Sequence, residues 1–225
     1  MIHLDRLTKR FWTNDGPRTV VNDLTLTFPT GASVALLGRN GAGKSTLLKL
    51  IAGTMRPTSG QVLSTGSISY PVGFAGSFHP DLTGLQNARF VARLYGMDTD
   101  ALTDFVQDFA ELGPHFYMPI RTYSSGMRAR LSFGTSMAIP FDTYLVDEVT
   151  SVGDGAFRQK SVALFDARRE TAGAIVVSHS PQMVKRICTM AVVLEQGEAT
   201  FYDDIDTALA HHDHNMKTPP HQRAG

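Results

Sequence analysis

Short apolar runs alternate with longer amphipathic stretches along most of the chain. The apolar runs are bounded by glycine, proline or asparagine and have the length of buried strands. They cover residues 33–37, 144–146, 174–177 and 190–194. Elsewhere apolar residues recur three and four positions apart, most clearly over 102–112, which is the spacing of a helix face that packs on a core. This alternation predicts an α/β protein with a mostly parallel core sheet.

Other parts of the chain depart from this alternation. Residues 2–7 and 20–28 indicate strands of an additional, antiparallel layer. Residues 71–139 start with a stretch rich in Gly, Pro and Phe and continue with helical patterns, which predicts a helical insert in the sheet. We expect one folded domain over residues 1–210. The polar segment 211–225 holds four histidines and two prolines, and we expect it to be disordered.

The composition limits the classes of partner. The 225 residues are 42% apolar and 19% charged, and Lys plus Arg equals Asp plus Glu at 21 each, so nothing indicates nucleic acid as a partner. The single cysteine, Cys188, cannot form an internal disulfide, and we interpret it as a small buried residue. No stretch approaches the ~20 apolar residues that span a bilayer, so we expect any membrane role to come through a partner.

A glycine-rich loop follows the first apolar run and precedes an amphipathic helix. It fits the phosphate-binding pattern G-x-x-x-x-G-K-[ST] at every required position. Glycines let backbone N–H groups surround phosphate oxygens, Lys44 reaches the β- and γ-phosphates of ATP, and the Ser45 hydroxyl binds Mg²⁺. The helix that begins at Ser45 points its positive end at the same phosphates. The predicted nucleotide-binding residues are Gly38, Arg39, Asn40, Gly41, Ala42, Gly43, Lys44, Ser45 and Thr46.

Two later strand ends carry polar residues suited to ATP hydrolysis. One apolar run is followed by Asp147, a candidate Mg²⁺ ligand acting through water, and by Glu148, a candidate general base for the attacking water. His179 lies just beyond another run, where an imidazole can donate a hydrogen bond to the γ-phosphate. Each residue alone is also compatible with a structural role, and the phosphate-binding loop favours the catalytic one. Glu148 and His179 are therefore the candidate catalytic residues, and Ser45 and Asp147 the candidate metal ligands.

These motifs, in this order, resemble those of the ATP-binding-cassette (ABC) ATPases over nearly the whole chain except the tail. The segment 123–131, Tyr-Ser-Ser-Gly-Met-Arg-Ala-Arg-Leu, stands where that family has its Leu-Ser-Gly-Gly-Gln signature. In the family the signature binds the γ-phosphate of an ATP held by a second subunit. The resemblance therefore implies that Ser124 and Gly126 contact ATP and that the active unit is a homodimer.

The resemblance implies two further contacts with the nucleotide or with the second subunit. An aromatic ring stacks on adenine in the family, and Phe11 stands at that position with Trp12 beside it as the second candidate. A place in the core is the alternative interpretation of either ring. Asp154 occupies the acidic position of the family's D-loop.

The sequence also departs from the family pattern. Ser125 and Met127 replace a glycine and the glutamine of the signature. No glutamine lies over 69–78, where the family places one against Mg²⁺ and the attacking water, and Gln86 comes too late in the chain. We still expect hydrolysis, because Glu148 and the histidine that senses the γ-phosphate are present.

The segments 73–84, 123–128 and 147–154 resemble the polysaccharide-export branch of the family. In that branch the ATPase works at the cytoplasmic face of the bacterial inner membrane and drives a separate transmembrane permease. Members that export O-antigen or teichoic acid often carry a long C-terminal extension, whereas this chain ends soon after the ATPase domain. We therefore expect export of capsular polysaccharide, with O-antigen and teichoic acid as alternatives.

Other hypotheses stay open. We expect the permease to dock on the insert at Phe74, Phe78 and Leu82, although internal packing of these side chains is equally compatible with the sequence. A soluble ABC ATPase acting on DNA or ribosomes is a different class, disfavoured because such proteins usually have paired cassettes or coiled-coil inserts. A non-hydrolysing, nucleotide-dependent scaffold is suggested by the missing glutamine. The histidines of 211–214 could bind a metal ion, but a solvated tail is favoured.

Overall fold

The computed structural model describes residues 1–72, 78–147, 155–178 and 180–217. Contacts divide the chain into two compact units. Of the described residues, the first unit contains 1–68, 142–147 and those from 172 onward. The second unit contains 69–72, 78–141 and 155–171. The helical insert expected over 71–139 falls within the second unit.

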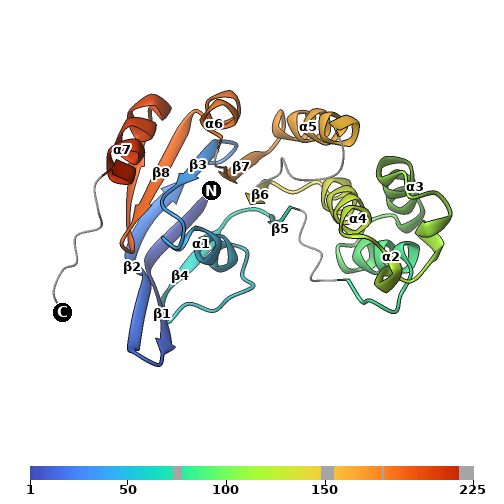
Figure 1. Ribbon diagram of the computed structural model, residues 1–225, viewed down its shortest axis with the longest axis horizontal. Helices are drawn as coiled ribbons and strands as arrows, with labels where there is room; N and C mark the ends of the chain where they lie inside the picture. Colours follow the sequence, from blue (N-terminus) through green and yellow to red (C-terminus); the bar gives the residue numbers. More distant parts are fainter. Residues whose placement is uncertain (73–77, 148–154, 179, 218–225) are drawn as a thin grey trace. The chain divides into compact units, whose positions relative to one another are not determined.

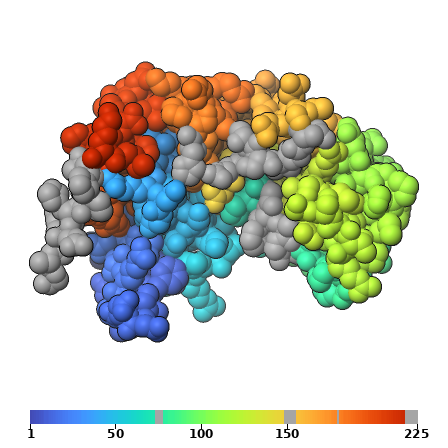
Figure 2. Space-filling model, in the orientation of Figure 1, coloured from blue at the N-terminus to red at the C-terminus, as the bar shows by residue number. Residues whose placement is uncertain are grey.

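An antiparallel sheet of three strands forms one layer of the first unit (Figure 1). Its order is β2-β1-β4, with β1 at Ile2–Thr13, β2 at Gly16–Phe28 and β4 at Ser59–Ser64. The strands expected at 2–7 and 20–28 are therefore present and longer than expected. A turn between Thr13 and Gly16 joins them, and Figure 2 shows this blue hairpin on the surface of the first unit.

The larger sheet is mostly parallel and has the order β5-β6-β7-β3-β8-β9. β3 runs parallel to β7 and β8, β6 runs parallel to β7, and β9 is antiparallel to its neighbour β8. The strands are β3 Ser33–Leu37, β5 Ile68–Pro71, β6 Thr143–Asp147, β7 Gly173–Val177, β8 Met190–Glu195 and β9 Glu198–Tyr202. All five residues of β7 are buried, as a continuous apolar run in a parallel sheet requires. The expected α/β fold is confirmed.

One hydrophobic core joins the two sheets and helix α1 (Lys44–Ile51) in the first unit. Four apolar residues of α1, at i, i+1, i+3 and i+4, are buried in it: Leu47, Leu48, Leu50 and Ile51. Since α1 follows the phosphate loop directly, this packing fixes the start of the helix and the loop before it. Cys188 is buried and directly follows α6 (Pro181–Ile187).

The second unit is helical. It contains α2 (Gly84–Leu94), α3 (Thr99–Ala110), α4 (Ser125–Ala138) and α5 (Gly155–Arg169), and short 3₁₀ helices link α3 to α4. The ring of Phe109 contacts the rings of Phe133 and Phe157, so α3, α4 and α5 share an aromatic core. The periodicity over 102–112 therefore indicated the buried face of α3 correctly.

The C-terminal helix α7 corrects one expectation. It spans Ile205–Lys217, so residues 211–217 are helical, although we expected disorder from His211 onward. Ala208 and Leu209 are buried, and the Asp204 carboxylate accepts a hydrogen bond from the Thr207 N–H at 2.8 Å, which caps the first turn. Residues 218–225 lie outside the described part. Among the described residues, no helix is both long and apolar enough to cross a bilayer.

Candidate nucleotide-binding site

The phosphate loop connects β3 to α1 and is shaped by three glycines with positive φ. Gly38, Gly41 and Gly43 have φ of 152°, 79° and 106°. A Cβ on Gly38 would collide with the Leu194 carbonyl oxygen, and one on Gly43 with the Val20 side chain. Gly43 is the N-cap of α1 and offers no side-chain cap, so the first N–H groups of the helix stay available for phosphate oxygens.

Lys44 already lies folded over the loop. Its ammonium donates to the carbonyl oxygens of Gly38 at 2.7 Å and of Arg39 at 2.9 Å. The Ala42 N–H donates to the same Arg39 oxygen at 3.1 Å and closes a tight turn. The loop therefore holds the positive charge in the concave space where a phosphate would be bound.

Ser45 and Asp147 meet at the end of the loop. The Ser45 hydroxyl donates to Asp147 Oδ2 at 3.1 Å, and both side chains are accessible to solvent. Asp147 ends β6 directly opposite Val177, the last residue of β7, so the parallel register brings it to the same edge of the sheet as the loop. A hydroxyl and a carboxylate are the hard oxygen donors that Mg²⁺ prefers, and the pair fits a Mg²⁺ ion completed by phosphate and water.

The signature residues lie in the second unit, at the start of α4. Ser124 is the N-cap of this helix, and its hydroxyl oxygen accepts from the Met127 N–H at 3.2 Å. Among the residues that the structure describes, a Cβ on Gly126 would approach only the Ser124 hydroxyl, at 3.9 Å. The arrangement is that of an anion-binding helix start.

The phosphate loop, the acidic end of β6 and the capped start of α4 all lie within a region that matches a known protein family. The profile of the ABC transporter family matches residues 21–151, more than half of the chain, including the phosphate loop and Asp147. The chain belongs to the ABC transporter family. As a member of this family it is an ATPase that drives transport.

Similar proteins cover almost the whole chain. The chain is 48% identical to the polysialic acid transport ATP-binding protein KpsT of Escherichia coli, over 93% of its own length and 97% of the relative's. It is 44% identical to the capsule polysaccharide export ATP-binding protein CtrD of Neisseria meningitidis serogroup B, over 94% and 98%. A solved dimeric ATP-binding cassette, MJ0796 bound to ADP and Pi, has the same fold, with a TM-score of 0.74 and 21% identity over 89% and 98% of the two chains.

The candidate adenine-stacking residues lie on β1 of this ABC protein. Phe11 is partly buried, and the Lys9 ammonium lies 5.1 Å from its ring centroid. Trp12 is 85% exposed. Because neighbouring strand residues face opposite sides of a sheet, only one of the two rings can face a given ligand. Phe11 stays the prediction, and its contact with Lys9, two residues before it on the strand, follows from no sequence motif.

Several sequence predictions lie outside the described residues. Glu148 and His179 are among them, as are Asp154 and Phe74. Within the described part, Gln86 has a structural role, because its side chain accepts from the Thr83 N–H at 2.9 Å while Thr83 accepts from the Gln86 N–H. This capping box was readable from the Thr-x-x-Gln spacing.

Tyr123 is a site residue to which sequence reasoning gave no role. It stands immediately before Ser124, is buried, and donates its hydroxyl to the His115 carbonyl oxygen at 2.6 Å. Burial raises the pKa of Tyr123. The tyrosine thereby anchors the turn that leads into α4, which fixes the position of the Ser124 cap.

Proposed function

We propose that this protein is the ATP-hydrolysing subunit of an ABC exporter that moves capsular polysaccharide across the bacterial inner membrane through a separate permease. The phosphate loop with Lys44 folded over it, joined to Asp147 through Ser45, carries the ATPase part of the proposal. The two relatives that align over nearly their full length are named for polysialic acid transport and capsule polysaccharide export, and they support the substrate. They favour capsular polysaccharide over O-antigen and teichoic acid.

In the proposed reaction the chain binds ATP and positions a water molecule. The loop N–H groups and Lys44 hold the phosphates, and Ser45 and Asp147 would hold Mg²⁺, which supplies charge neutralisation at the β- and γ-oxygens. Glu148 accepts a proton from the attacking water, and His179 donates a hydrogen bond to the γ-phosphate. These two assignments follow from the family motifs and are tested below by substitution.

A homodimer completes each nucleotide site in this proposal. The first turn of α4, with the Ser124 hydroxyl, binds the γ-phosphate of the ATP held by the partner. Ser124 can do this while it caps the helix, because its oxygen accepts from Met127 and its hydrogen remains available to the phosphate. Loss of the γ-phosphate removes these bonds and lets the dimer open.

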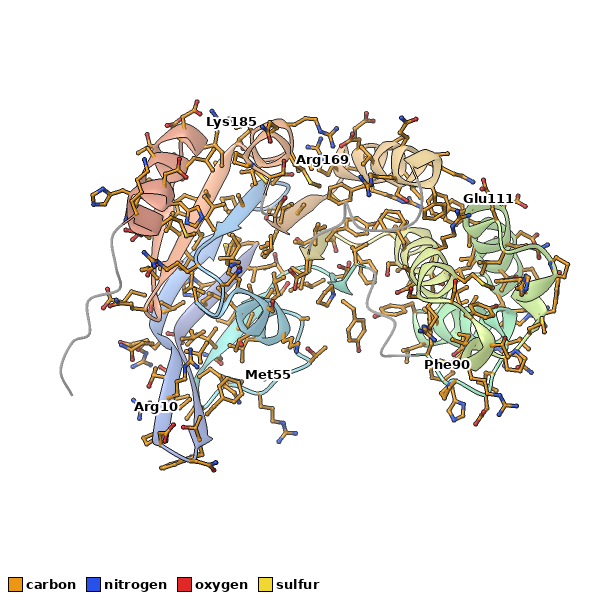
Figure 3. The ribbon with its side chains drawn as sticks, viewed as in Figure 1. Arg10, Met55, Phe90, Glu111, Arg169 and Lys185 are labelled. Carbon is orange, nitrogen blue, oxygen red and sulfur yellow. The ribbon has the colours of Figure 1, made fainter. Side chains whose placement is uncertain are left out.

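A groove in the second unit is the proposed docking site for a helix of the permease. Its cavity of about 120 Å³ is lined mainly by aromatic and aliphatic side chains, together with the hydroxyl side chains of Ser132, Thr135 and Ser136. Phe78 lines it as part of the predicted docking surface, together with Phe90 and Leu94 of α2, which are 56% and 63% exposed. Figure 3 shows Phe90 projecting from α2. Leu82, also expected to take part, is exposed outside the groove lining.

Two experiments test this function. Purified protein should hydrolyse ATP, and Glu148→Gln should remove the activity; equal turnover in both would indicate a scaffold instead of a motor. Deletion of the gene in its own bacterium should remove surface capsule and leave polymer inside the cell, at the cytoplasmic face where the ATPase is expected. Restoration by the wild type but not by Glu148→Gln supports the proposal. An intact capsule with lost surface O-antigen or teichoic acid would refute the substrate.

A further inference from the structure

The side chain of Arg39 connects the phosphate loop to the C-terminal helix. Its Nη2 donates to the carbonyl oxygen of Asn215 in the last turn of α7. Its Nε lies 3.5 Å from Glu195 Oε1 at the end of β8. The side chains of Arg39 and Glu195 are only 24% and 27% exposed, so this ion pair is partly shielded from solvent. In Figure 2 the red atoms of α7 border the light-blue atoms of the segment around residue 40.

This bond joins two segments that lie 176 residues apart in the chain. A guanidinium is always charged, so its bond to the Asn215 carbonyl is charge-assisted and stronger than a bond between neutral groups. Arg39 therefore ties the phosphate loop to α7.

The position of this carbonyl is itself fixed by contacts along α7. The Tyr202 hydroxyl of β9 lies 2.7 Å from Nδ1 of His211, and Asn215 Nδ2 lies 3.2 Å from Nε2 of the same ring. The rings of Tyr202 and His211 pack at a centroid distance of 5.6 Å. β9 thus holds the middle of α7, and α7 presents its last turn to Arg39.

The backbone of Arg39 links this contact to the catalytic machinery. Its carbonyl oxygen accepts from the Lys44 ammonium at 2.9 Å and from the Ala42 N–H at 3.1 Å. One residue therefore has its side chain on α7 and its carbonyl on the phosphate-binding lysine. The side-chain contact with α7 and the carbonyl contact with Lys44 therefore meet at a single residue.

We propose that α7 is a positioning element of the nucleotide site and acts through Arg39 as a positioning residue. Docked α7 holds residues 38–40 in the conformation that receives the phosphates, and loss of its contacts weakens nucleotide binding. The proposal rests on ATP binding by this loop, as proposed above. It assigns a role in ATP affinity to His211 and Tyr202, which lie on elements outside the loop and have no assigned contact with nucleotide.

The test is a titration of the full-length protein with a fluorescent ATP analogue and Mg²⁺. We expect Arg39→Ala to weaken binding about three- to fivefold, the effect of losing a partly exposed ion pair. Arg39→Lys should restore part of the affinity. His211→Ala and Tyr202→Phe should weaken binding in the same direction without altering the loop sequence. Met216→Ala, an exposed residue in the same turn as Asn215, is the matched control and should bind as the wild type does.

A double-mutant cycle separates this role from a direct contact of Arg39 with phosphate. If α7 acts through Arg39, His211→Ala should have no further effect in the Arg39→Ala background, because the shared path is already broken. Faster hydrogen exchange at residues 38–44 in His211→Ala than in Met216→Ala should accompany the loss of affinity. Wild-type affinity in His211→Ala, or additive losses in the cycle, would overturn the inference while leaving the proposed function intact. Failure of the wild type to bind the analogue would refute the proposed function instead.

Discussion

The Ser45 hydroxyl lies 3.1 Å from Asp147 Oδ2, although 102 residues separate the two in the chain. The parallel arrangement of β3, β7 and β6 explains the contact, because the loop and Asp147 both follow the carboxyl ends of strands in one sheet. This is the edge where open α/β sheets bind ligands. The contact therefore joins the predicted phosphate-binding residue Ser45 to the acidic end of β6.

We expect Asp147→Asn to lower the apparent Mg²⁺ affinity of the ATPase by about 10–100-fold, as loss of an outer-sphere ligand does. The amide keeps the shape of the side chain but removes the negative charge. A Mg²⁺ titration of ATPase activity measures the shift. Asp203→Asn, at an exposed position after β9, serves as control. An equal Mg²⁺ dependence in both variants would contradict the metal assignment.

Ser124 permits a substitution that separates helix capping from phosphate binding. Aspartate is as good an N-cap as serine, but its carboxylate repels a γ-phosphate and has no hydrogen to donate. In a Glu148→Gln background, ATP should convert the protein to a dimer, and added Ser124→Asp should keep it monomeric with unchanged melting temperature. Size-exclusion chromatography with light scattering distinguishes the dimer from the monomer. A stable ATP dimer carrying Ser124→Asp would argue against the composite site.

The groove of the second unit can be tested without touching the nucleotide site. Phe90→Asp and Leu94→Asp place charges at exposed positions of α2 and should abolish capsule export while basal ATPase activity persists. Met118→Asp changes another exposed apolar side chain, 43% accessible and outside the groove, and should export normally. Normal surface capsule in the two α2 variants would exclude this groove as the docking site.

Lys160 of α5 caps the end of α3 within the second unit. Its ammonium donates to the carbonyl oxygens of Asp108 and Phe109 at 3.2 and 3.1 Å and pairs with Glu111 at 2.6 Å. We expect Lys160→Met to lower the free energy of unfolding by about 1 kcal/mol, the worth of a cation at a helix C-terminus. Arg158→Met, exposed on the same helix, should change it by less. Chemical denaturation measures the free energy of unfolding of both variants. An equal loss in Lys160→Met and Arg158→Met would contradict the capping role.

Because of Tyr123, we expect the free energy of unfolding to decrease in alkaline solution. Burial raises its pKa above that of an unfolded tyrosine, so the folded state retains the phenolic proton when the unfolded state loses it. Its contribution to stability is complete below about pH 10 and declines as the pH rises toward the folded value. The free energy of unfolding should therefore fall more steeply above pH 10 in the wild type than in Tyr123→Phe. If the free energy of unfolding depends on pH in the same way in both proteins, Tyr123 does not have this effect.

The sequence predicted β3, β6, β7 and β8 of the core sheet to within one residue at either end, because each is a short apolar run between turn-forming residues. It did not predict β5 and β9, which are partly exposed and are not continuous apolar runs. It also predicted the phosphate loop, because the glycines and the lysine that define this loop are close together in the sequence. Helix α7 was not predicted, since its last turns depend on contacts with Tyr202 of β9 and with Arg39, which lies 176 residues from Asn215 in the chain. Polar, histidine-rich composition gave no sign of those contacts.

The roles of Tyr123 and Lys9 were missed for a related reason. Tyr123 matters through the carbonyl of His115 and Lys9 through the ring of Phe11, and neither contact follows from a motif. Gln86 is different, because its capping box with Thr83 was visible in the sequence and its explanation needed no structure. The predictions for Glu148 and His179 stay predictions.

The bonds from the Lys44 ammonium to two loop carbonyls have a thermodynamic consequence for ATP binding. A free lysine side chain loses roughly 2 kcal/mol of rotational entropy when it is immobilised. Here the immobilisation accompanies folding, so an arriving nucleotide meets a charge that is already oriented. Small anions such as pyrophosphate, which gain nothing from the adenine contact, should therefore compete measurably with ATP.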